Sequence, residues 1–331
     1  MVSLPFSVAC RNKPGATEGQ AGLRPLPRSP ISQGWGATMA YKRLSEFAAP
    51  AQATPDLWRI GAVLGLMFVT VMVLQQLVFI VVAGFGGPNA VEAIFQSDGT
   101  SAGRTLAALF SHGLFALGLV VALRAMHWRG FLSLFGPGAH AAGDFFRVLY
   151  WLVPLYIGAI AILPTDYDVV PNALMPTNRW LLYLPLGLAA VAVQAGTEEV
   201  FFRGYLTQQI AAGTREGSWA WMAVPAILFA LLHWTASSGD NAIWFCLWAL
   251  CFGLVAADLT ARAGNLGPAL ALHIVNNAVA LLGVSLPGPA AGLALYHTPF
   301  AADAGVIPGL MPVEFALLLV AWLAARVAIR A

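Results

Sequence analysis

Long runs of apolar residues alternate with short polar segments along most of this chain. The runs cover residues 60–83, 106–123, 145–163, 181–211, 219–235, 242–259, 266–282 and 315–328. A helix that spans a membrane needs about 20 predominantly apolar residues. The pattern therefore predicts an all-α, polytopic membrane bundle of about eight transmembrane helices.

Composition supports this fold class. The chain is 59% hydrophobic and 10% charged, with a mean hydropathy of +0.74, which excludes an ordinary soluble domain. Residues 1–55 are rich in Pro, Gly, Ser and Ala without apolar periodicity and are predicted to form a disordered tail. Met39 is an alternative start, and we expect the first 38 residues to be dispensable.

The positions of the basic residues predict the orientation. Eight spans place both termini on one side of the membrane. If that side is the cytosol, all but Arg104 and Arg179 of the 17 Lys and Arg residues fall in cytosolic segments. This bias is the positive-inside rule, so we expect both termini in the cytosol.

Polar residues recur in three places within the last five predicted helices. They are Glu198, Glu199 and Arg203, then Phe229 and His233, then His273 and Asn277. An ionised carboxylate at the centre of a membrane helix costs roughly 2.5–3.5 kcal/mol even on lenient insertion scales. Two adjacent glutamates at that depth therefore indicate a functional centre.

Helical spacing gives the two glutamates different roles. Glu199 precedes Arg203 by four residues, so the two lie on one face and are expected to form an ion pair. Whether that pair is structural or takes part in the chemistry stays open. Glu198 points about 100° away from Glu199 around the helix. It can therefore face the other polar residues, where we expect it to act as a general base that takes a proton from water.

The remaining polar residues complete a hydrolytic site in one of two ways. Glu198, His233, His273 and Asn277 could hold a divalent metal, with zinc the expected ion, or the same side chains could stabilise the oxyanion of a tetrahedral intermediate. Either arrangement requires Glu198 to lie at the depth of the histidines. We therefore predict one continuous helix over residues 181–211.

These motifs resemble the CAAX-protease and bacteriocin-processing (CPBP, or Abi) family of intramembrane proteases. Its pattern is E-E-x-x-x-R, then F-x-x-x-H, then H-x-x-x-N or D, and all three occur here in order. The resemblance implies an intramembrane metalloprotease-like peptide hydrolase in which Glu198, aided by His233, activates water. His273 and Asn277 would bind metal or the oxyanion, and Glu199 and Arg203 would brace the site.

The resemblance also divides the chain and suggests its partners. Residues 1–55 would be a cytosolic tail, 56–180 the first three helices, 181–283 the catalytic core, and 284–331 an outer loop with the last helix. Expected partners are the lipid bilayer and a protein or peptide substrate, which could be lipid-modified, and no nucleic acid. The expected location is the bacterial inner membrane.

Two other function classes compete with proteolysis. A non-catalytic membrane scaffold or bacteriocin-immunity protein could retain the same fold, and a proton-coupled transporter could use the buried Glu and His residues as a relay. The sequence shows no inverted repeat typical of such transporters. Other residues of these helices are interpreted as structural: His112 as a packing residue, Phe229 as part of the pocket wall, and Asp258 with Arg262 as an ion pair.

Overall fold

The computed structural model describes residues 41–95, 101–162, 167–215 and 217–330. Within these ranges the helices are α1 (Lys42–Ala48), α2 (Trp58–Phe95), α3 (Ala102–His127), α4 (Gly138–Ile162), α5 (Thr177–Glu199), α6 (Thr207–Gly213), α7 (Ala220–Leu231), α8 (Ala242–Ala263), α9 (Gly267–Ala278) and α10 (Ile307–Ala328). Two π-helical segments follow α5 and α9, namely η6 (Val200–Leu206) and η8 (Val279–Gly283). Short 3-10 segments are η4 (Ala49–Ala51), η5 (Phe131–Leu134), η7 (Ala236–Asn241) and η9 (Ala291–Leu293).

The predicted membrane bundle is confirmed, with a refinement in helix length. Six helical stretches of the described chain are long and apolar enough to cross a bilayer, and two shorter apolar helices accompany them. The shorter ones, Ala220–Leu231 and Gly267–Gly283, correspond to the predicted runs 219–235 and 266–282. The protein is a multi-pass integral membrane protein.

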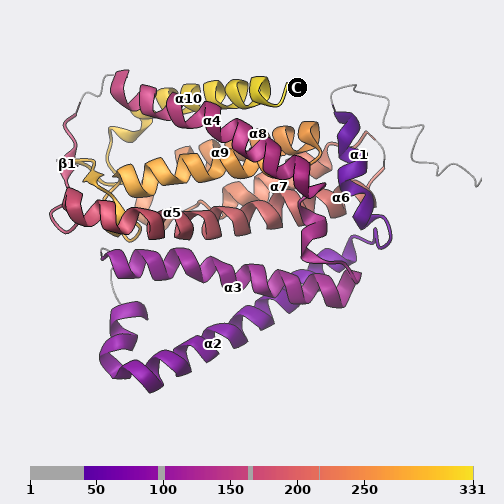
Figure 1. The fold of residues 1–331 in the computed structure, drawn as a ribbon, viewed down its shortest axis with the longest axis horizontal. Helices are drawn as coiled ribbons and strands as arrows, with labels where there is room; N and C mark the ends of the chain where they lie inside the picture. Colours follow the sequence, from indigo (N-terminus) through magenta and orange to yellow (C-terminus); the bar gives the residue numbers. More distant parts are fainter. Residues whose placement is uncertain (1–40, 96–100, 163–166, 216, 331) are drawn as a thin grey trace, which may run out of the picture.

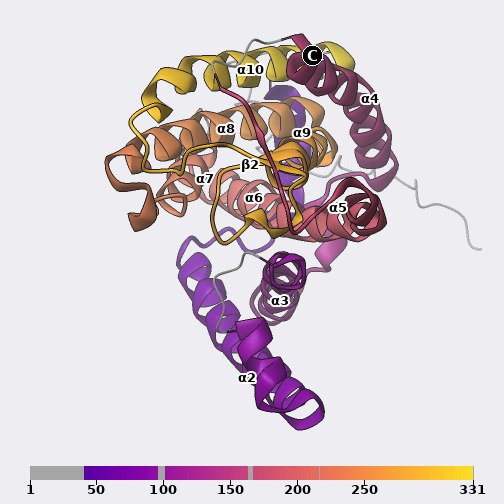
Figure 2. The same cartoon turned by 90° about the vertical axis from the view of Figure 1, so that its left-hand side faces the viewer.

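The bundle has a buried centre and one projecting edge. Half of the residues in the apolar window of α8 are buried, compared with 11% in α2. α2 crosses α3 and then diverges from it, so the pair projects from the remaining helices, whereas α4 and α10 cover the opposite side (Figures 1 and 2). We infer that the exposed face of α2 contacts lipid.

One continuous helical stretch carries the glutamates. α5, η6 and α6 follow one another without interruption from Thr177 to Gly213, and α5 leads directly into α6 in Figure 1. The backbone is right-handed helical at Val200, where η6 begins, and at Thr207, which follows its end. The prediction of one long helix is therefore confirmed, with a π-helical section inside it that sequence periodicity did not predict.

The predicted disordered tail over residues 1–55 is wrong for its last part. Residues 1–40, including Met39, lie outside the described residues, but α1 is helical and buries Leu44 and Phe47. Tyr41 beside it donates a hydrogen bond of 2.6 Å to Asp258. Too few apolar residues occur here to show a period, yet those present pack into the core.

The predicted pair of Asp258 and Arg262 is present at the end of α8, with an N–O distance of 2.8 Å. Asp258 also accepts a 2.9 Å hydrogen bond from the indole of Trp322 on α10. Together with the Tyr41 bond, this contact ties the start of α1 and α10 to α8, which confirms the structural interpretation of Asp258.

A small sheet closes the end of the bundle opposite α1 (Figure 1). β1 (Val170–Pro171), β2 (Val284–Ser285) and β3 (Tyr296–His297) are arranged in the order β1-β3-β2. β3 pairs antiparallel with β1 and parallel with β2. The sheet holds together the loops that precede α5 and follow η8.

Candidate active site

Glu199 and Arg203 form a fully enclosed ion pair. Arg203 Nη1 lies 2.8 Å from Glu199 Oε1, and both side chains are 0% exposed. The same oxygen accepts a 2.7 Å hydrogen bond from Nδ1 of His273 on α9. The predicted pair is confirmed, and through Glu199 it also fixes the orientation of the His273 ring.

Aromatic rings surround this pair. The guanidinium carbon of Arg203 lies 4.6 Å from the ring centroid of Phe229 and 5.8 Å from that of Phe252. Phe229 also contacts the His233 ring, at 4.5 Å between centroids. Cation–π contacts strengthen when they are desolvated. Phe229 therefore forms part of the wall around the site, as expected.

Glu198 occupies a different environment. Gln194 Nε2 donates a 2.6 Å hydrogen bond to its Oε1, and its side chain keeps 21% exposure. Nε2 of His273 lies 3.6 Å from Oε2, and Nε2 of His112 lies 3.8 Å from Oε1. The two glutamates thus diverge as predicted, one sealed in an ion pair and the other reachable between histidines.

The hydrogen bonds of the three histidines fix their tautomers. Nδ1 of His233 is 2.8 Å from the Phe229 carbonyl oxygen, and Nδ1 of His112 is 3.1 Å from the Ala108 carbonyl oxygen. A carbonyl oxygen only accepts, as does the Glu199 carboxylate beside His273, so each Nδ1 carries the hydrogen. In the neutral rings every Nε2 is therefore left with a free lone pair.

The free nitrogens belong to the same cluster. Two of them are those of His112 and His273 beside Glu198, and His233 interacts electrostatically with both Glu198 and His273. These groups can take up, hold and pass on a proton.

Asn277 lies one contact away from Glu198. Its Nδ2 donates to Gln194 Oε1 at 2.8 Å, and its Oδ1 accepts from Asn276 at 3.3 Å. Its predicted direct role as a metal or oxyanion ligand remains a prediction, because these contacts are to other amides.

The residues do not assemble as a metal centre in this arrangement. Among the described residues, no group of three or more His, Cys, Asp or Glu side chains is placed to hold a metal ion. The Asn277 oxygen, the fourth predicted donor, is occupied by Asn276. The zinc site of Glu198, His233, His273 and Asn277 therefore remains a prediction.

Sequence reasoning missed two residues of this cluster. His112 was interpreted as a packing residue, yet its ring faces Glu198 from α3. Gln194 was not singled out, although it precedes Glu198 by four residues and so shares its helix face. That spacing was the available signal for Gln194. Nothing in the sequence indicates how α3 is rotated toward α5.

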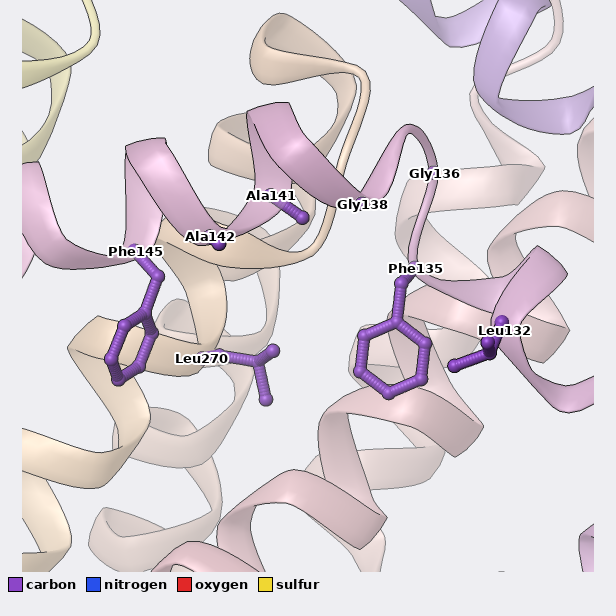
Figure 3. A pocket seen from close by; sticks show the side chains of 8 residues that line it. All are labelled: Leu132, Phe135, Gly136, Gly138, Ala141, Ala142, Phe145 and Leu270. Carbon is purple, nitrogen blue, oxygen red and sulfur yellow. The ribbon is translucent and has the colours of Figure 1, made fainter.

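An apolar cavity lies elsewhere in the bundle. Its volume is about 430 Å³, and eight residues from η5, α4, α9 and the turn between η5 and α4 line it, among them Phe135, Phe145 and Leu270 (Figure 3). None of the polar cluster lines it. The cavity is therefore separate from the candidate site.

Comparison with known proteins shows a family resemblance over part of the chain. Residues 179–279 match the model described as type II CAAX prenyl endopeptidase Rce1-like, a family of peptidases, and this range contains every predicted site residue. The uncharacterized protein YyaK of Bacillus subtilis (strain 168) is 27% identical over 170 residues, 50% of this chain and 56% of YyaK. The match thus spans about half the length of that relative.

No solved structure matches the chain. The family model instead coincides with α5 to α9, the helices that carry Glu198 and His273 together with His233 beside α7. Over this segment the chain is similar to the Rce1-like family, and the predicted resemblance to CAAX proteases is confirmed.

Proposed function

We propose that this protein is an intramembrane endopeptidase in which Glu198 activates the attacking water. The observation that carries the proposal is a partly exposed carboxylate, that of Glu198, beside the Nε2 atoms of two histidines, next to a second carboxylate that is sealed in an ion pair. A general base must lie within hydrogen-bond reach of its water, directly or through a small shift. Glu198 meets this condition and Glu199 does not.

The reaction follows from these positions. Glu198 takes one proton from water as the oxygen attacks the peptide carbonyl carbon, which forms a tetrahedral intermediate. The C–N bond then breaks, and the proton passes to the leaving nitrogen with the help of His233. The products are one carboxylic acid, which then gives up its proton to the amine, and one amine, and Glu198 regains its ionised form.

Glu199 and Arg203 support this chemistry without joining it. Their ion pair is sealed from solvent, and Glu199 holds Nδ1 of His273. The pair therefore keeps the second nitrogen of His273 directed at Glu198. Catalytic groups gain most when packing and hydrogen bonds fix them before the substrate arrives.

The substrate class follows from the family and the location. A peptide bond in a membrane-associated protein or peptide can reach a site among transmembrane helices. The matched family cleaves prenylated substrates by its description, so a lipid-modified peptide is one candidate and an unmodified one the other. We further propose a bacterial inner-membrane location.

Cleavage in proteoliposomes tests the proposal. Comparison of membrane peptidomes from cells with the wild-type protein and with Glu198→Gln would identify substrate peptides. Quenched fluorescent versions are then offered with and without a farnesylated cysteine. We expect cleavage by the wild type and at least a roughly 10²-fold loss in Glu198→Gln and in His233→Ala.

Glu46→Gln on α1 is the matched control, since it makes the same change at an exposed position of another helix and should leave cleavage intact. Retained cleavage by Glu198→Gln would overturn the proposal. A cellular phenotype that survives both substitutions would instead favour the scaffold or immunity function. Metal content of the active preparation, measured alongside, decides the zinc prediction.

A further inference from the structure

A chain of side-chain hydrogen bonds leads from α4 across α9 to Glu198. The Tyr156 hydroxyl donates to Asn276 Oδ1 at 3.3 Å, and Asn276 Nδ2 donates to Asn277 Oδ1 at 3.3 Å. Asn277 Nδ2 donates to Gln194 Oε1 at 2.8 Å, and Gln194 Nε2 donates to Glu198 Oε1 at 2.6 Å. Four consecutive bonds thus end on the proposed base.

Every bond in this chain points in the same direction. Each amide accepts with its oxygen on the Tyr156 side and donates with its nitrogen on the Glu198 side. Turning any one amide around would bring two oxygens or two nitrogens together. The carboxylate at the end, which only accepts when ionised, therefore sets the orientation of the whole chain.

The chain gives Glu198 one orientation. Hydrogen bonds to a charged acceptor are shorter and stronger than neutral ones, and connected bonds polarise one another. The bond lengths agree, since they shorten from 3.3 Å at Tyr156 to 2.6 Å at Glu198. Oε1 is held by Gln194 while Oε2 lies beside His273, so the carboxylate plane is fixed.

We propose that Gln194 is a positioning residue that couples Asn277, and behind it Asn276 and Tyr156, to Glu198. Asn277 then acts on the reaction through Gln194 and holds the base in one orientation. This inference rests on the proposed function. It adds a residue outside the three motifs and a route by which α4 supports the site.

Gln194→Met tests the coupling because methionine keeps the length of the side chain and removes both amide bonds. We expect kcat to fall by about 10- to 100-fold, as for loss of a hydrogen bond to a charged group, with KM nearly unchanged. The acid limb of the pH–rate profile should move to higher pH by about one unit, because the ionised form of Glu198 loses a donor. Gln209→Met is the matched control.

Gln209 lies on the same continuous helix and is also buried, but it donates to the Thr54 carbonyl oxygen, far from this chain of bonds. Its replacement should lower stability without moving the pH profile. A purely structural role for Gln194 would give the same result as Gln209→Met.

Other charged groups face Glu198, and they make a second variant informative. They are His112 on α3, His233 after α7, His273 on α9, and the paired Glu199 and Arg203. The Gln194→Glu variant keeps all of these groups and changes only the side chain that donates to Glu198. When protonated, the new carboxyl can accept from Asn277 and donate to Glu198, but once ionised it repels Glu198.

Gln194→Glu should therefore be active at acid pH and lose activity as pH rises, the reverse of the Gln194→Met effect. Tyr156→Phe removes the first donor alone and should shift the acid limb in the same direction as Gln194→Met by a smaller amount. If Gln194→Met does not fold, Gln194→Glu and Tyr156→Phe test the role of Gln194 in its place.

The inference would be overturned if Gln194→Met kept the kcat and the pH profile of the wild type while Glu198→Gln stayed inactive. The same holds if both Gln194→Glu and Tyr156→Phe behaved like the wild type. Cleavage by Glu198→Gln would instead remove the proposed function itself. The two failures are therefore distinguishable.

Discussion

At the scale of single residues, the most demanding feature is the charge sealed between Glu199 and Arg203. Neither side chain has any exposure. Removing one partner of such a pair leaves an uncompensated buried charge, whereas replacing both with neutral groups is often tolerated. The stability of this centre therefore depends on the pair as a unit.

We expect Arg203→Met to destabilise the protein by about 3–5 kcal/mol, because Glu199 would lose its only cation at hydrogen-bond distance among the described Arg and Lys residues. The double variant Glu199→Gln/Arg203→Met should regain a large part of this loss, since the introduced amide carries no charge and its oxygen can still accept from His273. Unfolding in detergent, followed by circular dichroism, measures both. A double variant no more stable than Arg203→Met would contradict the argument.

The sequence predicted contacts within a helix better than contacts between helices. The spacing of four residues was enough to pair Glu199 with Arg203 and Asp258 with Arg262. The partner of His273 Nδ1 is Glu199, whereas its Nε2 faces Glu198. Which glutamate a histidine on another helix contacts depends on helix rotation, and periodicity does not determine it.

At the scale of helices, a close crossing of α7 and α8 supports the site. A Cβ at Gly253 would lie 2.9 Å from both Cα and Cβ of Ala226. The neighbouring Phe252 contacts the rings of Phe229 and His273, at 5.8 and 4.9 Å between centroids. The missing side chain at Gly253 thus lets α7 and α8 approach where their aromatic residues meet the site.

Gly253→Ala should cost about 1–3 kcal/mol of stability by overpacking and should lower cleavage because Phe229 and Phe252 move. Gly65→Ala on α2 is the matched control, since nothing lies within 4 Å of its Cβ position. It should be neutral or stabilising by up to about 1 kcal/mol. Thermal unfolding and the peptide assay compare the two variants. If Gly253→Ala and Gly65→Ala had the same stability and cleavage rate, the close crossing of α7 and α8 would not support the site.

The apolar pattern predicted the helices but not their irregularities. All eight runs correspond to helices, because burial in lipid and in the core both require apolar residues. The π-helical section η6 and the end of α7 at Leu231 occur within apolar sequence, so hydropathy gives no sign of them. Packing against neighbouring helices decides both features. π-helical turns are frequent at functional sites.

At the scale of the whole molecule, the basic residues gather at one end of the bundle. α1 and α6 lie at that end and β1 at the other (Figure 1). The loops at the end with β1 carry few Lys or Arg residues, in agreement with the positive-inside rule. We therefore propose that the end with α1 and α6 faces the cytosol.

Cysteine labelling tests this orientation in a variant whose three native cysteines are replaced. With a membrane-impermeant maleimide, Ala290→Cys should be labelled in intact cells, because residue 290 lies in the loop near the sheet and is exposed. Arg215→Cys, exposed between α6 and α7, should be labelled only after permeabilisation. The opposite pattern would invert the orientation.

The early end of α7 bears on how water enters. Twelve residues of helix extend about 18 Å, well short of the roughly 30 Å hydrocarbon core. Residues 232–241 follow α7, and most of them are exposed. Irregular backbone at such depth requires surrounding protein or a hydrated cavity. We infer that His233, just beyond the end of α7, lies where water can reach the site.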